Sequence, residues 1–147
     1  MNYSLTIKII LILLFIYLLI IFIVYTKQRS LLYVPQIDNY DDEQLIISAD
    51  QVFIENSSNI KLRSIFYKHP SNTKTTLLMF HGNAGPIENR FYKINKLSKY
   101  DQNILLISWR SYSGNDGVPT EEGLYDDARS AIKSVSYTHL RAHETAV

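Results

Sequence analysis

The stretch TTLLMFHGNAGP, Thr75 to Pro86, contains the pattern that decides the fold. Its first part, Thr75 to Phe80, is a short continuous apolar run, which is typical of a strand buried on both faces of a parallel sheet. The rest places a histidine, two glycines and an asparagine in one loop that ends at Pro86, a residue suited to the first position of a helix. We therefore predict a strand, a tight loop and a helix in succession.

A second strand and a second helix are predicted further along the chain. The run NILLIS, Asn103 to Ser108, repeats the buried-strand pattern, and apolar residues recur at helical spacing on either side of it. These apolar positions are Ile87, Phe91, Ile94 and Leu97 in the first helix and Leu124, Ala128, Ala131 and Ile132 in the second. Thr120 is a suitable N-cap for the second helix, because its hydroxyl can accept a hydrogen bond from an amide of the first turn.

Upstream of this unit the sequence predicts a hairpin of two antiparallel strands. Val52 and Ile54 alternate with other residues, turn-forming residues follow from Asn56 to Asn59, and the extended pattern resumes from Ile60 to Tyr67. The order hairpin, strand, helix, strand, helix predicts an α/β fold whose parallel strands are covered by helices on both faces. Asn56 also begins the pattern N-S-S, a glycosylation acceptor in proteins that are exported from the cytosol.

The chain begins with an apolar run that is unbroken from Ile9 to Tyr25 and extends past Lys8 to Leu5. About twenty apolar residues cross a bilayer, so we predict a transmembrane helix over residues 5–25 after a tail of residues 1–4. A cleaved signal peptide is the alternative, but no small-residue cleavage motif follows the run. The predicted partner of residues 5–25 is the lipid bilayer, and the predicted location is an endomembrane or the plasma membrane, with one pass. Positive-inside counting is nearly tied and leaves the orientation open.

The remaining boundaries follow from composition. A connector is predicted over residues 26–50 and a partial α/β domain over residues 51–134. Residues 135–147 have no periodicity useful for a helix or a strand, and residues 135–145 resemble a translated sequencing adapter. We expect the native sequence to end near Ser134, and the chain to be the front portion of a larger protein, because residues 51–134 are few for a typical α/β domain.

Composition and missing motifs argue against several classes of function. The net charge is +1 with scattered basic residues, so no nucleic-acid partner is predicted. The absence of cysteine rules out disulfides and thiolate chemistry within the chain. Neither G-x-x-x-x-G-K-[ST] nor G-x-G-x-x-G occurs, so a nucleotide cradle has little support. His81 stands alone in its loop, and His139 and His143 lack a further ligand, so no metal and no cofactor are predicted.

On its own, the loop from His81 to Pro86 supports two interpretations. It can be a tight turn between a strand and a helix, with no further role. It can also be an anion site, because glycines let the backbone approach a bound group and the free amides at a helix start attract negative charge. The anion would be a phosphate or a transient oxyanion.

The stretches LLMFHGNAGPIENR and NILLISWRSYSGNDGVPTEEGLYDDARSAI together resemble the alpha/beta-hydrolase family, in particular its single-pass membrane branch related to the yeast bud-emergence suppressor. Members of that branch have H-G-N-A-G after the third strand, then D-Y-R-G-Y-G after the next strand, and a P-[ST]-E-E-G-L-Y-x-D-A helix start. The resemblance covers roughly Gln51 to Ile132. It implies the amino-terminal part of an alpha/beta-hydrolase sheet, preceded by one transmembrane helix.

The resemblance also implies a serine hydrolase that acts on a small acylated substrate, by ester, thioester or amide hydrolysis. In this fold two backbone N–H groups hold the oxyanion, one of them from the loop after the third strand. By position the implied oxyanion-hole donor is the amide of Asn83, with that of Ala84 second. The residues implied to support the loop are His81, Gly82, Gly85 and Arg110. His81 is implied to orient the loop rather than to act as the catalytic base.

The chain departs from the family pattern in two ways. Serine or tryptophan replaces the usual Asp, Tyr, Gly and Gly at Ser108, Trp109, Ser111 and Ser113. No G-x-S-x-G occurs, so the nucleophile, the acid and the base are expected downstream of Ser134, and the chain as it stands is predicted to be inactive. The changes at Ser111 and Ser113 leave open an alternative, a non-catalytic membrane-anchored interaction protein with the same fold.

Overall fold

The computed structural model describes residues 3–35 and 47–144, with side chains to residue 136. The chain forms two compact units, residues 1–33 and residues 34–147. The predicted connector lies partly outside the described residues, and the helix of the first unit runs into it as far as Leu32.

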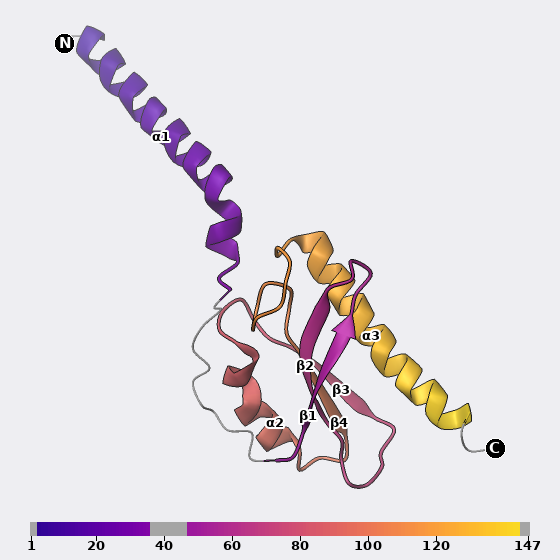
Figure 1. The fold of residues 1–147 in the computed structure, drawn as a ribbon. Helices are drawn as coiled ribbons and strands as arrows, with labels where there is room; N and C mark the ends of the chain where they lie inside the picture. The colour runs from indigo at the N-terminus through magenta and orange to yellow at the C-terminus, as the bar shows by residue number, and fades with distance from the viewer. Residues whose placement is uncertain (1–2, 36–46, 145–147) are drawn as a thin grey trace. The chain divides into compact units, whose positions relative to one another are not determined.

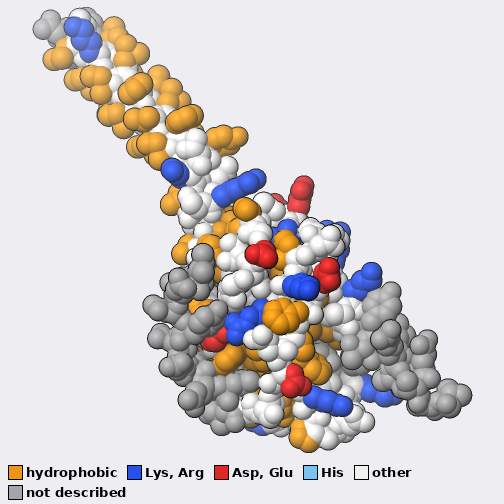
Figure 2. All heavy atoms as spheres, viewed as in Figure 1, with side chains coloured by type: hydrophobic (Ala, Val, Ile, Leu, Met, Phe, Trp, Pro, Cys, Tyr) orange, Lys and Arg blue, Asp and Glu red, His pale blue; other side chains and the backbone are white. Residues whose placement is uncertain are grey.

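The first unit is the helix α1, Tyr3–Leu32 (Figure 1). Its apolar side chains are exposed along the helix, as the orange surface in Figure 2 shows, and none of its apolar stretch is buried. The apolar helix Ser4–Leu32 has 29 residues. At about 1.5 Å per residue it exceeds the ~30 Å of a bilayer core, so α1 is long and apolar enough to cross a membrane.

The second unit contains a four-stranded sheet with the order β1-β2-β4-β3. Its strands are β1 (Asp50–Glu55), β2 (Lys61–Tyr67), β3 (Thr76–Phe80) and β4 (Asn103–Ile107). The predicted hairpin is confirmed, with Glu55 opposite Lys61 in an antiparallel pair. The predicted parallel pair is confirmed as well, with Phe80 of β3 opposite Ile107 of β4. An antiparallel pair between β2 and β4 joins the two halves into one mixed sheet.

Alternate side chains of β2 and β4 enter two separate core layers, because successive residues of a strand point to opposite faces. The layer on one face contains Ile65, Tyr67, Ile87, Phe91, Ile94, Ile104 and Leu106, of which Phe91 and Ile94 belong to α2. The layer on the other face contains Ile54, Leu62, Leu105, Ile107 and Ala131, and it includes α3. Helices therefore cover both faces, as predicted, and every residue of β4 is buried.

The strand β3 is less buried than its sequence predicts. Leu77, Leu78 and Met79 are half-buried, and the side chain of Phe80 is 38% exposed. The reason is position, since β3 lies at the end of the sheet and its outer edge pairs with no strand among residues 47–144.

The helix predicted after Pro86 begins as a 3-10 turn, η1 (Ile87–Arg90), and continues as α2 (Phe91–Leu97). Pro86 is the N-cap, with an extended backbone (φ −73°, ψ 167°), so its predicted place inside the helix is wrong by one residue. The predicted apolar face is confirmed, because Ile87, Phe91 and Ile94 are buried.

The helix α3, Glu121–Glu144, starts where predicted. The hydroxyl of Thr120 accepts the N–H of Gly123 at 3.1 Å, which confirms the N-cap. The predicted apolar stripe is partly wrong: Ile132 is 54% exposed, whereas Asp127 and Ala131 are fully buried. The helix turns this face inward because Asp127 binds a buried arginine, described below.

Residues 135–144 are helical, although their sequence has no useful helical periodicity. The helix continues to Glu144, and Val135 packs against the second core layer. The sequence from 135 to 144 contains neither proline nor glycine, so nothing local ends the helix there.

Candidate functional site

Two loops meet at the carboxyl ends of β3 and β4, where open α/β sheets bind their ligands. The first, His81 to Pro86, is called the HGNAG loop below, and the second, Ser108 to Pro119, is called the β4 loop. The indole N–H of Trp109 donates to the carbonyl of His81 at 2.9 Å, and the Trp109 ring stacks on Phe80 with centroids 4.8 Å apart. The two loops are therefore in direct contact beside the sheet.

The imidazole of His81 connects the two loops from the inside. His81 is 5% exposed; its Nδ1 lies 2.7 Å from the Gly82 carbonyl, and its Nε2 accepts the backbone N–H of Trp109 at 3.2 Å. Burial is the main reason that the pKa of His81 falls from 6.5 to about 4; the bond to Gly82 opposes this shift, and the charge of Arg90 adds to it. The ring is thus neutral at pH 7, with its proton on Nδ1, and both nitrogens are engaged.

The centre of the HGNAG loop faces solvent. Gly82, Asn83 and Ala84 are exposed, whereas His81 and Gly85 on either side are buried. Among the hydrogen bonds of residues 3–35 and 47–144, none uses the backbone N–H of Asn83 or Ala84. These two amides can therefore donate to a group that approaches from outside.

The two glycines of the HGNAG loop have different roles. Gly85 has φ +79°, and a Cβ there would lie 2.7 Å from the Asn89 side-chain nitrogen, so the loop requires glycine at this position. Gly82 has no positive φ, and a Cβ there would meet nothing within 4 Å. The expectation that Gly82 supports the turn finds no steric basis; its missing side chain leaves open space next to the exposed amides.

The backbone of the β4 loop is left-handed at both positions where the alpha/beta-hydrolase motif has glycine. Ser111 has φ +69° and Ser113 has φ +53°. Ser113 is 2% exposed, and its hydroxyl accepts the N–H of Ile87 at 2.8 Å. This bond satisfies an amide at the start of η1, which helical bonding leaves unpaired. The side chain of Ser113 thus links the β4 loop to the helix behind the HGNAG loop.

The buried Arg110 is held by carboxylates rather than directed to solvent. Its Nη2 lies 2.7 Å from Asp127 Oδ1 and 3.2 Å from Asp126 Oδ2, and its backbone N–H donates to Asp127 Oδ2 at 3.1 Å. Hydrogen bonding to Asp127 is the main reason that the pKa of Arg110 is raised. A Cβ on Gly123 would lie 2.6 Å from the guanidinium, so glycine there makes room for it. A bracing role for Arg110 fits these contacts.

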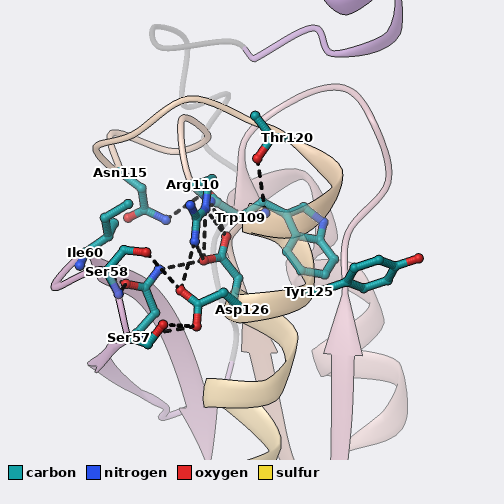
Figure 3. A network of polar contacts seen from close by, with 12 residues as sticks. Ser57, Ser58, Ile60, Trp109, Arg110, Asn115, Thr120, Tyr125 and Asp126 are labelled. Carbon is teal, nitrogen blue, oxygen red and sulfur yellow. Dashed lines mark hydrogen bonds and ion pairs between the residues drawn. The ribbon is translucent and has the colours of Figure 1, made fainter.

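The same carboxylates hold the turn of the β1–β2 hairpin (Figure 3). The side-chain N–H of Asn56 donates to Asp127 at 2.7 Å, and the hydroxyls of Ser57 and Ser58 donate to Asp126 at 2.6 and 3.1 Å. Asn56 is 5% exposed, so the folded domain offers no free amide for a glycan at the N-S-S pattern. The network thus joins the hairpin turn, α3 and the β4 loop.

A hollow of about 530 Å³ lies elsewhere, at the amino ends of β3 and β4. Thr76, Asn103 and Val135 are among its lining residues, and none of the lining residues belongs to the HGNAG loop. Ligands of α/β sheets bind at the opposite strand ends, so we place the candidate site at the exposed amides. Within the described residues, no group of three histidine, aspartate or glutamate side chains is arranged to hold a metal ion.

The structure adds site residues for which the sequence suggested no role. They are Trp109, Tyr112, Ser113 and Asp127, each of which bonds to Arg110 or to a residue of the HGNAG loop or η1. Tyr112 and Asp127 match the family motifs, which was the one available signal for them. Trp109 and Ser113 are departures from those motifs, and only their contacts show what they do.

Comparison with known proteins agrees with this geometry. No protein-family model matches the chain. The chain is 27% identical over 117 residues to the alpha/beta hydrolase domain-containing protein WAV2 of Arabidopsis thaliana, covering 74% of this chain and 38% of WAV2. It is 37% identical over 67 residues to protein bem46 of Schizosaccharomyces pombe, covering 42% of this chain and 21% of bem46. The solved esterase Pf2001 of Pyrococcus furiosus matches with a TM-score of 0.55 at 17% identity, over 70% of this chain and 40% of the esterase.

The chain therefore has the alpha/beta-hydrolase fold. Its sequence relatives include WAV2 and bem46, the yeast bud-emergence suppressor, which confirms the resemblance inferred from the two motifs. The chain spans about two fifths of the length of WAV2 and of the esterase (38% and 40%).

Proposed function

We propose that the chain is the amino-terminal part of a membrane-anchored serine hydrolase that cleaves an ester, thioester or amide bond of an acylated substrate. One observation carries the proposal: Asn83 and Ala84 in the loop after β3 are exposed, and their backbone N–H groups have no hydrogen-bond partner among the described residues, while both flanks of the loop are fixed. Fixed amides at the carboxyl end of a parallel strand can stabilise the oxyanion of a tetrahedral intermediate.

In this mechanism the charge appears on the former carbonyl oxygen when a serine attacks the acyl carbon. The amide of Asn83, with that of Ala84 second, donates to this oxygen, and the residue after the nucleophile supplies the other donor. Losing one such donor typically costs about 10²- to 10³-fold in kcat. Gly85 shapes the loop, and Arg110 braces the neighbouring β4 loop through Asp127.

His81 orients the HGNAG loop and is not the base. A general base must accept a proton near neutral pH, whereas the lowered pKa of about 4 leaves His81 a weak base, and Trp109 already donates to its free nitrogen. The base, the acid and the nucleophile are expected beyond Ser134, because no G-x-S-x-G occurs among the 147 residues.

The apolar helix α1 supports anchoring in a membrane, and the bilayer is the partner we propose for it. The alternative, a non-catalytic interaction protein, rests on the serines at 111 and 113. Both serines keep a left-handed backbone, so their presence does not argue for a disrupted loop.

The test is to obtain the genomic sequence downstream of the Ser134 codon and to express the complete coding sequence. We expect a G-x-S-x-G motif, labelling of its serine by a fluorophosphonate probe, and hydrolysis of p-nitrophenyl acyl esters. Replacing that serine with alanine is the control. A complete protein without this motif, or with the motif but neither labelling nor hydrolysis, would contradict the proposal.

A further inference from the structure

The side chain of Asn83 is held from two sides, although the residue itself is exposed. The hydroxyl of Tyr112 lies 2.9 Å from the backbone carbonyl of Asn83 and 3.1 Å from its Oδ1, and it donates to this pair. The backbone N–H of Val34 donates to the same Oδ1 at 3.3 Å. The side chain of this exposed residue thus bonds to two segments that are distant from it in the sequence.

Tyr112 is the rigid side of this arrangement. It is 2% exposed, and its ring packs edge-on against the ring of His81 with centroids 5.0 Å apart. A tyrosine side chain held in this way has little freedom, so its hydroxyl has a fixed position. The backbone of Asn83 is therefore tied to the interior of the β4 loop.

Val34 is the second side, and it comes from a distant part of the sequence. It forms an isolated parallel bridge with Ala84, in addition to its bond to Asn83. Only Tyr33 separates Val34 from Leu32, the last residue of α1. The segment that follows the apolar helix is thus part of the same contact set as the exposed amides.

We propose that Tyr112 and Val34 form a clamp on Asn83 that positions the backbone amides of Asn83 and Ala84, and that Val34 makes this geometry depend on the segment next to the membrane helix. Both are positioning residues, since neither touches the reacting atoms. The catalytic part of this inference rests on the proposed function. A displacement of about 1 Å at a catalytic group can cost about 10²-fold in rate, so a loop with two solvent-exposed donors benefits from fixed supports.

The clamp can be tested on the chain itself, in detergent micelles, by ¹⁵N relaxation of the Asn83 and Ala84 amides. Tyr112→Phe removes only the hydroxyl, whereas Val34→Pro removes the N–H donor and also fixes φ at this position. We expect order parameters near 0.85 in the parent chain and below about 0.6 in both variants, while the amides of β4 are unchanged. Val34→Ala, which keeps the N–H, is the matched control and should behave as the parent. Unchanged order in Tyr112→Phe and Val34→Pro would overturn the clamp.

A kinetic test on the complete protein addresses the positioning role. We expect Tyr112→Phe and Val34→Pro to lower kcat about tenfold to a hundredfold with little change in KM, and Val34→Ala, which keeps the N–H donor, to lower kcat less than Val34→Pro does. Increased amide motion with an unchanged kcat would overturn the positioning role. If the complete protein hydrolyses nothing, the proposed function fails, and the relaxation result still decides whether the clamp exists.

Discussion

Ser111 and Ser113 offer a pair of substitutions with opposite expected effects. Both residues occupy the left-handed region, which costs a non-glycine residue about 1–2 kcal/mol. Glycine removes this cost but loses about 0.5–1 kcal/mol of chain entropy on folding. Ser111→Gly should therefore stabilise the fold by about 0.5–1 kcal/mol, because no hydrogen bond of the Ser111 hydroxyl is found within the described residues.

Ser113→Gly also removes the strain of a positive φ, but it removes the hydroxyl that accepts the Ile87 N–H as well. Ile87 is fully buried, so its amide is left unpaired at a cost of about 1–3 kcal/mol. The net result should be a loss of about 1 kcal/mol. Ser113→Ala keeps the backbone strain and also removes the acceptor, so it should be the least stable of the three, at about 1–3 kcal/mol below the parent.

The assay is denaturant unfolding of the full chain in micelles, followed by the fluorescence of Trp109. This is the only tryptophan of the chain, and it contacts both Phe80 and His81. The difference between the two glycine variants should exceed 1 kcal/mol, well outside the error of such curves. If Ser113→Gly is as stable as Ser111→Gly, the bond from Ile87 contributes nothing and our account of the β4 loop is wrong.

Three further predictions concern the same region. The pKa of His81 is lowered to about 4 in the folded chain, so the unfolded chain binds a proton at a higher pH than the folded chain does. The free energy of unfolding is therefore highest above pH 6.5 and falls by about 3 kcal/mol as the pH drops to about 4. His81→Gln should flatten the pH dependence of stability in this range. Asp127→Asn should lower the free energy of unfolding by about 3–5 kcal/mol, because it leaves Arg110 buried without its main charged partner. Asp126 is more exposed, so Asp126→Asn should lower it by less than about 1 kcal/mol. Gly85→Ala should cost about 1–3 kcal/mol by the same measurement and Gly82→Ala less than about 0.5 kcal/mol; equal costs would contradict the assignment of φ at these positions.

The strands and their pairing could be predicted from sequence because local patterns carry that information. The apolar runs ending at Phe80 and Ile107 identify buried strands wherever they occur, and the N-cap at Thr120 is readable from the residue and its neighbours. The lower burial of β3 could not be predicted, because the pattern of one strand does not state its place in the sheet.

For the candidate site, too, one part could be predicted from the sequence and another could not. The position of the HGNAG loop at a strand end follows from order along the chain, whereas the different needs for glycine at Gly82 and Gly85 appear only in the structure. The hydrogen-bond partners of the site residues could not be predicted from the sequence, since Tyr112 lies 29 residues from Asn83 and Ser113 lies 26 residues from Ile87. The predicted buried face of α3 is partly wrong for this reason. An aspartate in a helix is normally solvated, and only the arginine packed against Asp127 makes it a core residue.

The left-handed backbone of the β4 loop explains how a few neighbouring residues contact several separate elements. Arg110 reaches α3, whereas Tyr112 reaches Asn83 and Ser113 reaches Ile87, all from four consecutive residues. An extended strand would point alternate side chains to opposite faces, and a helix would spread them around its axis. The positive φ values at Ser111 and Ser113 instead fold the chain tightly enough for successive side chains to brace separate elements. The strain at these two positions is therefore a condition of the site's geometry, and the Ile87 bond offsets part of it at Ser113.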